Sequence, residues 1–248
     1  MDHSVPLTTS FYIWFLGIPI AYTVLAVIYR LCNYWPKLAD KGTRLSDMMA
    51  FEIVAGIVLA YMGISGTIIW FQLNPNWDVT SINQDKYLGY SKHVEDHLLM
   101  PMLTYQAWQT VLCLILPDLT DWSMIGHHVV TSLLAYVCMH PALHYYSCFF
   151  FGLAETTNIP LSIIDTFKYF PEYKQRYPML DMCAQGVFVI SFYGIRIIYW
   201  TIVQYELFIM LIPKLIDNTA HSNVVVCIFA GAALFLSGLQ WYWGYKIV

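Results

Sequence analysis

The sequence predicts an all-α integral membrane protein built as a bundle of about seven transmembrane helices. Of its 248 residues, 58% are hydrophobic and 11% are charged, whereas soluble domains usually carry about 25% charged residues. The mean hydropathy is +0.55. Apolar stretches of about 20 residues, the length that crosses a bilayer as a helix, alternate with short polar connections. We expect spans at residues 11–31, 48–71, 97–117, 122–139, 142–167, 179–200 and 223–244.

The first two spans form an N-terminal two-span region, residues 1–85. In the first span, Pro19 predicts a kink in the helix. The second span carries Gly56, Gly63 and Gly66, small residues that let a neighbouring helix approach closely. No basic residue precedes the first apolar stretch, so we interpret it as a retained span and not as a cleaved signal peptide.

The third, fourth and fifth spans follow one another closely. An acidic turn at residues 118–121 joins the third span to the fourth, and a turn at Pro141 joins the fourth to the fifth. Helices joined by such short connections are usually antiparallel neighbours. We therefore expect the fourth and fifth spans to pack side by side.

The apolar stretch from Met179 to Ile212 is longer than one bilayer crossing requires. We expect a sixth span that ends near Trp200 and is followed by a tilted continuation or an interfacial helix. The lysines and arginines of the loops predict the orientation. With the N-terminus on the non-cytoplasmic side, eight of them lie in cytoplasmic loops and three outside, which favours a cytoplasmic C-terminus.

Composition also limits the partners. The formal net charge is −4 and the basic residues form no patch, so nucleic acid is not an expected partner. The six cysteines lie mostly within apolar stretches and include no close-set pair. This pattern is typical of small buried hydrophobic residues and not of a disulfide or zinc framework.

Polar side chains gather in the fourth and fifth spans, where a membrane makes them costly. His127 and His128 lie near the start of the fourth span, and His128 shares a helical face with Thr131. Four polar residues of the fifth span, at intervals of three, four and three, also share one face. They are Glu155, Asn158, Ser162 and Asp165. At about 1.5 Å per residue, we expect His128 level with residues 158–162 and Glu155 one turn deeper.

This cluster suits acid–base or nucleophilic chemistry on an acyl group. A histidine can take a proton from a hydroxyl or an amine, or accept the acyl group itself, and a carboxylate such as Glu155 can orient or activate it. Alternatively, these groups only hydrogen-bond the helices together. A metal site is disfavoured because His127 and His128 are adjacent and not four residues apart. His140 and His144 have that spacing, but at the other membrane face.

Arg196 is the basic residue that lies deep within an apolar stretch, in the expected sixth span. It could pair with a carboxylate such as Glu155, or bind an anionic lipid headgroup or phosphate. Alternatively, it lies near the outer interface and extends its guanidinium toward water.

The stretch from Asp121 to Lys168 resembles the TLC domain, the membrane family of ceramide synthases and translocation-associated membrane proteins. The matching features are HHVVTSLL after an acidic turn, an acidic residue 27 positions after His128, and a lysine near the end; FVISFYGIRIIYW is similar to a later helix of the family. The resemblance covers residues 86–248, a TLC-like domain that we expect to pack with the first two spans as one bundle. It implies a lipid-accessible central cavity.

The acidic motif departs from that of ceramide synthases. Those enzymes have His-Asp followed three residues later by a second Asp, whereas this chain has Ala154, Glu155 and Asn158. The sequence is therefore more similar to the TLC-domain-containing branch that is not ceramide synthase.

We expect a TLC-type protein that binds a membrane lipid and acts as an acyltransferase or lipid-remodelling enzyme, with no bound cofactor and acyl-CoA as a candidate co-substrate. Catalytic residues would be His127, His128 and Glu155; substrate-binding residues would be Asn158, Ser162, Asp165, Arg196 and Thr131. The alternative is a non-catalytic lipid-binding or scaffold subunit of a larger membrane complex, with protein partners. The resemblance implies the endoplasmic reticulum, although a mitochondrial or other organellar membrane is also open.

Overall fold

The structure, a computed structural model, describes residues 9–32, 38–72, 86–139 and 142–247, and the described part is mostly helical and contains no strand. The helices are α1 (Thr9–Leu31), α2 (Leu45–Gln72), α4 (Lys92–Val94), η2 (Glu95–Leu99), α5 (Met100–Ile115), η3 (Pro117–Leu119), α6 (Trp122–Cys138), α7 (His144–Phe150), η4 (Leu153–Thr157), α8 (Asn158–Tyr169), α9 (Pro171–Arg176), α10 (Pro178–Ser191), η5 (Phe192–Tyr199), α11 (Trp200–Ile216) and α12 (Asn223–Ile247).

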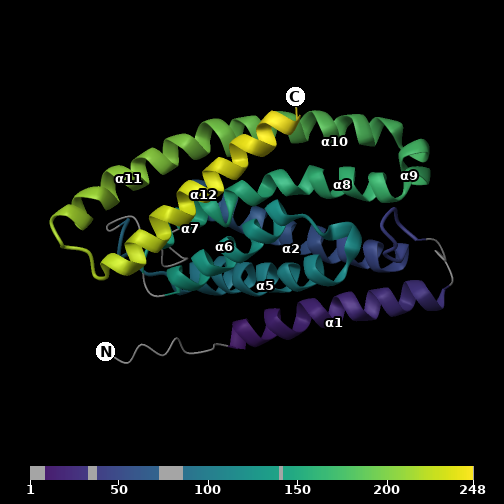
Figure 1. The fold of residues 1–248 in the computed structure, drawn as a ribbon, viewed down its shortest axis with the longest axis horizontal. Helices are drawn as coiled ribbons and strands as arrows, with labels where there is room; N and C mark the ends of the chain where they lie inside the picture. Colours follow the sequence, from purple (N-terminus) through teal and green to yellow (C-terminus); the bar gives the residue numbers. More distant parts are fainter. Residues whose placement is uncertain (1–8, 33–37, 73–85, 140–141, 248) are drawn as a thin grey trace.

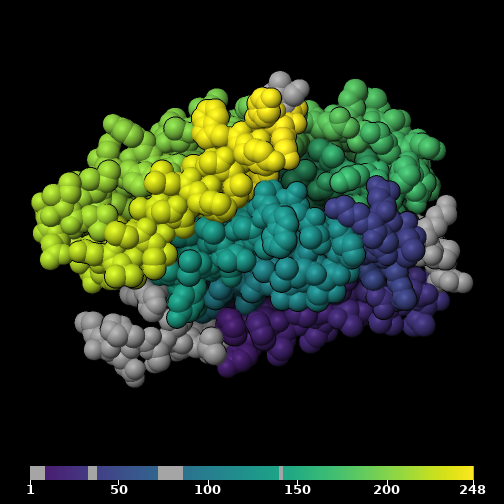
Figure 2. All heavy atoms as spheres, viewed as in Figure 1, coloured from purple at the N-terminus to yellow at the C-terminus, as the bar shows by residue number. Residues whose placement is uncertain are grey.

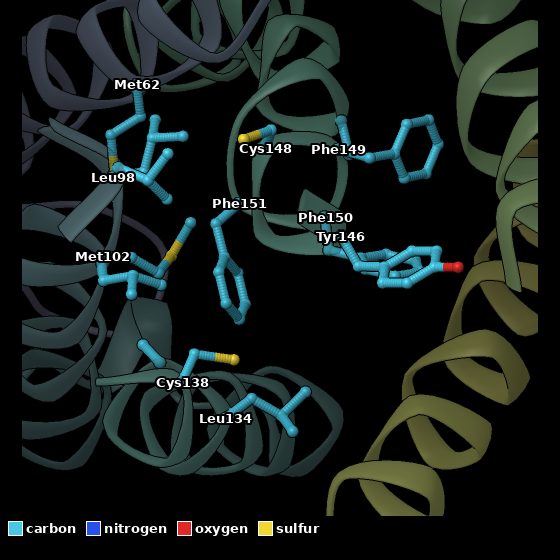
Figure 3. Packing of buried hydrophobic residues seen from close by; sticks show 14 of the residues in the cluster. Met62, Leu98, Met102, Leu134, Cys138, Tyr146, Cys148, Phe149, Phe150 and Phe151 are labelled. Atoms are coloured by element: carbon cyan, nitrogen blue, oxygen red, sulfur yellow. The ribbon is translucent and has the colours of Figure 1, made fainter. Parts of the chain in front are cut away.

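The helices form one bundle, with α2, α5 and α6 in the middle (Figure 1). α1 packs on α2 and α5 along one side, and the α10–α11 segment lies along the opposite side. α12 crosses the bundle obliquely and packs on α6, η5 and α11. The apolar core lies between α2, α5, α6 and α7, where Phe151 points into the space between Met102 and Cys138 (Figure 3).

The all-α membrane bundle that the sequence predicts is confirmed. Six helical stretches in the described part of the chain are long and apolar enough to cross a membrane. The expected fourth span forms α6, whose 17 residues equal the shortest length that usually crosses a bilayer. The orientation of the termini stays a prediction, and so does the domain boundary at residue 85, which lies outside the described residues.

The fifth span is broken, which the sequence did not predict. α7 ends at Phe150, the chain bends at Gly152, and the 3₁₀ turn η4 leads into α8. Gly152 lies directly against Gly66 of α2, because a Cβ added to Gly66 would lie 2.0 Å from the Gly152 Cα. The glycines of α2 thus permit close helix approach, as predicted, and the bend is held against them.

The break changes the neighbours of the fifth span. α8 packs on α2 and α10, whereas α6 packs on α5 and α12. Direct packing of the fourth span against the polar half of the fifth was therefore a wrong expectation. The bend at Gly152 turns α8 away from α6, and their polar faces become opposite walls of a cavity.

The helix of the sixth span continues past Trp200, which agrees with the predicted continuation. Residues Pro178–Ile216 form one helical stretch of 39 residues. Its middle part, η5, is a π-helix, a wider helix that appears mostly in short pieces and frequently at functional sites. Arg196 lies within this π-helical part.

Asp121 caps the N-terminus of α6, and its removal gives a pH-dependent prediction. The Ser123 hydroxyl donates to the Asp121 carboxylate, as do the backbone N–H groups of Ser123 and Met124. These hydrogen bonds hold the pKa of Asp121 below its ordinary value of 3.8. The cap therefore stabilises the fold above that pH, and the contribution is lost as the pH falls through the lower folded-state pKa.

We expect Asp121→Ala to lower the free energy of unfolding by about 1 kcal/mol at pH 7 and by less near pH 3. Denaturant titrations in detergent at both values measure the difference. Asp217→Ala is the control, since this exposed carboxylate follows the last turn of α11 and caps no helix N-terminus. Equal losses for Asp121→Ala at the two pH values would contradict the capping role.

Candidate functional site

A cavity of about 480 Å³ opens within the bundle, bounded by α2, α5, α6, α8, α12 and the π-helical η5. The surface is hollowed between the C-terminal part of α12 and the α8–α10 segment (Figure 2). Seven of the eight residues predicted for the site line this cavity: His127, His128, Glu155, Asn158, Ser162, Asp165 and Arg196. Its volume lies in the range of small-molecule sites.

Arg196 and Glu155 form a buried pair at the cavity wall. The Nη2 of Arg196 lies 3.5 Å from Oε1 of Glu155, and its Nε donates to the Thr157 hydroxyl at 2.6 Å. Asn158 donates from its side-chain amide to the other carboxylate oxygen of Glu155. Both charged residues are 4% exposed. The pairing of Arg196 with Glu155 is therefore present, and the guanidinium does not extend toward water as the alternative expected.

His128 is oriented by Gln106 of α5. The Nδ1 of His128 lies 2.5 Å from the Oε1 of Gln106. Because an amide oxygen only accepts hydrogen bonds, Nδ1 carries the proton in this arrangement and Nε2 keeps its lone pair. In its neutral form, His128 therefore presents Nε2 as its basic nitrogen. The hydroxyl of Ser132, one turn on, also faces α5 and donates to Leu103 O.

Glu155 does not orient an imidazole, which differs from the sequence-based expectation. Its partners are Arg196 and Asn158, because the bend at Gly152 places η4 beside η5 and not beside α6. The amide of Gln106 takes the orienting role at His128.

His127 faces a different neighbour. Its ring lies 5.3 Å from that of Trp243 in α12 and 5.3 Å from that of His128, measured between ring centroids. Thr131, one turn further along α6, does not line the large cavity. It lines a smaller pocket that His127 also borders. Thr131 therefore lines the same small pocket as His127, whereas the sequence predicted it on the same face as His128.

The polar face of the fifth span leads from the Arg196–Glu155 pair toward the mouth of the cavity. Asn158, Ser162 and Asp165 follow Glu155 in that order along α8, and all line the cavity. Glu52 of α2 lines it too and is 7% exposed. The regular spacing in the sequence thus identified a continuous polar wall, although its partner helices are α2 and α10.

No group of three His, Cys, Asp or Glu side chains in the described part of the chain could hold a metal ion. His144 is buried, with Nε2 placed 2.9 Å from Cys138 O, so it connects the start of α7 to the end of α6. His140 lies outside the described residues.

The whole bundle matches one family model, that of the TLC domain, over residues 2–248. This chain belongs to the TLC-domain family. The matched residues include α1 and α2. No curated protein and no solved structure matches the chain. The family is one of membrane lipid-associated proteins, and the branch within it stays a prediction.

The TLC domain's cavity also contains residues that the sequence analysis did not place in the site. Gln106 and Gln109 of α5 and Trp243 of α12 line it, and Gln240 lines the smaller pocket. The signal in the sequence was a glutamine within an apolar span, which is costly without a partner. That signal was weak because no regular spacing connected these glutamines to the histidines.

Proposed function

We propose that this TLC-domain protein binds a membrane lipid in the large cavity and transfers an acyl group there, with His128 as the general base. The observation that carries the proposal is a cavity open to the surroundings that His128 and Glu155 both line. A scaffold needs no such space. The apolar part of the lining suits acyl chains, and the polar side chains of α6, η4, α8 and η5 suit a headgroup and the reacting groups.

The chemistry follows from the fixed tautomer of His128. Its Nε2 lone pair takes the proton of an acceptor hydroxyl or amine while the acceptor atom attacks the acyl carbonyl carbon. The bond from that carbon to the leaving oxygen or sulfur then breaks, and His128 returns the proton to the leaving group. An acyl thioester such as acyl-CoA and a phospholipid ester are the candidate donors.

The polar wall would position the substrate. The charge of Arg196 is balanced by Glu155, so this pair offers hydrogen bonds to a headgroup with little net charge. Asn158, Ser162 and Asp165 add polar contacts nearer to the mouth. His127 is a second candidate base or acyl acceptor. We place the protein in the endoplasmic reticulum membrane, as its family resemblance implies.

Lipidomics tests the proposal in cells that lack the protein and are rescued by variants. We expect the native protein to restore the lipid profile and His128→Ala to fail, since removing a general base typically costs about 10²–10⁴-fold in rate. Glu155→Gln, which breaks the ion pair with Arg196 at the cavity wall, should fail as well. Val129→Ala is the matched control, because Val129 follows His128 in α6 but faces outward, 49% exposed. All proteins are compared at equal abundance.

Variants of Gln106 test the role of the His128 tautomer in the same cells. Gln106→Leu removes the hydrogen bond that fixes the His128 tautomer, so we expect activity to fall. Gln106→Glu keeps an accepting oxygen there and should retain more of it. If the variants of His127, His128 and Glu155 all restore the profile in full, the acyl-transfer proposal fails and a non-catalytic lipid-binding or scaffold role replaces it.

A further inference from the structure

A second, much smaller pocket lies behind the Arg196–Glu155 pair. It has a volume of about 20 Å³ and lies where α6, α12, the η5–α11 helix and the end of α7 meet. Aromatic and aliphatic side chains form most of its lining, among them Phe150, Trp200 and Leu236. Polar groups in such a place are costly unless each has a hydrogen-bond partner.

Four polar atoms at this pocket have no hydrogen-bond partner among the described residues. They are the Nδ1 of His127, the Oγ1 of Thr131, and the Oε1 and Nε2 of Gln240. Thr131 is 4% exposed and Gln240 is 1% exposed, so neither side chain reaches bulk water. All three residues line the same pocket, although they come from two different helices. Their convergence indicates a ligand and not three separate packing faults, because buried polar groups in native proteins are almost always satisfied.

The size of the pocket limits that ligand. A water molecule needs about 10–15 Å³ of such space and two to four polar partners. The pocket therefore has room for one water and too little for a lipid headgroup. The partners also suit water, which donates two hydrogen bonds and accepts two. The Gln240 amide both donates and accepts, as does the Thr131 hydroxyl, and the imidazole nitrogen does one or the other.

We propose that this pocket binds one ordered water molecule, held by Thr131 and Gln240, which hydrogen-bonds to Nδ1 of His127 and fixes the orientation of that ring. His127 borders both the small pocket and the large cavity. The water thus orients the His127 ring, as Gln106 orients the His128 ring. Gln240 and Thr131 are positioning residues that act on the large cavity through His127. This inference holds independently of whether acyl transfer occurs there.

The first test is an experimental structure of the native protein in lipid at a resolution that reveals ordered water. We expect density within hydrogen-bond distance, about 3 Å, of His127, Thr131 and Gln240 at once. An empty pocket would overturn the proposal. So would a Gln240 side chain turned to bond His127 or Thr131 directly, or an acyl chain in the pocket.

The second test follows the His127 ring by ¹⁵N NMR in protein labelled at its eight histidines, with the His127 signal assigned from its loss in His127→Asn. Gln240→Leu removes two of the four polar atoms at similar volume and should shift the Nδ1 signal of His127. Thr131→Val, nearly isosteric, should shift it in the same direction by less. Gln185→Leu is the control, since Gln185 is an exposed glutamine of α10 far from the pocket lining.

A shift in the two pocket variants but not in Gln185→Leu supports the water site. An unchanged His127 signal in folded Gln240→Leu would overturn it. If Gln240→Leu does not fold, the His127 signal in Thr131→Val and the density in the native structure decide whether the water is present. Failure of the acyl-transfer proposal would appear in lipid profiles and would leave both of these readouts as expected, so the two inferences are separable.

Discussion

Replacing Arg196 by methionine is expected to lower the free energy of unfolding by about 3–5 kcal/mol, the usual cost of breaking a buried ion pair from one side. The guanidinium is 4% exposed and contacts Glu155 and Thr157. Without it, the Glu155 carboxylate stays buried with only the amide of Asn158 as a described partner. Unfolding in mixed detergent and denaturant, followed by circular dichroism, measures the loss.

The double variant Arg196→Met/Glu155→Gln is the control for this pair. Since it removes both charges together, no unpaired charge remains, and we expect it to be clearly more stable than Arg196→Met alone. A coupling energy of about 0.5–3 kcal/mol is typical of residues in contact. If the effects of the two single substitutions simply add, Arg196 and Glu155 do not act as a pair.

Gly66→Ala is expected to lower the free energy of unfolding by a similar amount, because the added methyl group has no room. A Cβ at position 66 would lie 2.0 Å from Cα and 2.6 Å from C of Gly152, and backbone atoms cannot move aside as a flexible side chain can. Overpacking usually costs about 1–3 kcal/mol and sometimes more. We expect the upper end of that range, together with displacement of the η4 turn that carries Glu155.

Gly231→Ala provides the matched comparison, because nothing lies within 4 Å of a Cβ at that position in α12. There, alanine should raise stability by about 0.5–1 kcal/mol through its better helix propensity. Thermal unfolding of the two variants in the same detergent shows the contrast. If both glycines tolerate alanine equally, α2 and the bend of the fifth span are not in backbone contact.

The sequence was sufficient to predict the membrane bundle and one polar wall of the cavity. Glu155, Asn158, Ser162 and Asp165 share a face because helical periodicity alone sets their directions, and all four line the cavity. Periodicity is a local property of the chain. All four residues follow the break at Gly152, so the break does not change which way they point relative to one another.

The partners of that wall could not be predicted in the same way. They depend on the angle at Gly152, and a glycine in an apolar stretch is compatible with a straight or a bent helix. Gln106 and Gln240 were not placed in the site for a related reason. Neither belongs to a regular row of polar residues that points to the histidines, and only the three-dimensional packing of α5 and α12 against α6 places them there.

The uninterrupted 39-residue helix from Pro178 to Ile216 also sets a relation between the protein and the thickness of its membrane. At 1.5 Å per residue it is about 58 Å long, nearly twice the roughly 30 Å hydrocarbon core. Even at a tilt of about 40°, the upper end of what is observed, it would span about 45 Å along the bilayer normal. Hydrophobic side chains such as Ile202, Ile209 and Ile216 stay exposed along its second half. At that tilt the helix exceeds the hydrocarbon core by about 15 Å, so its ends reach into the interfacial regions of the bilayer. A thicker bilayer would cover more of its apolar surface, and a thinner one would cover less.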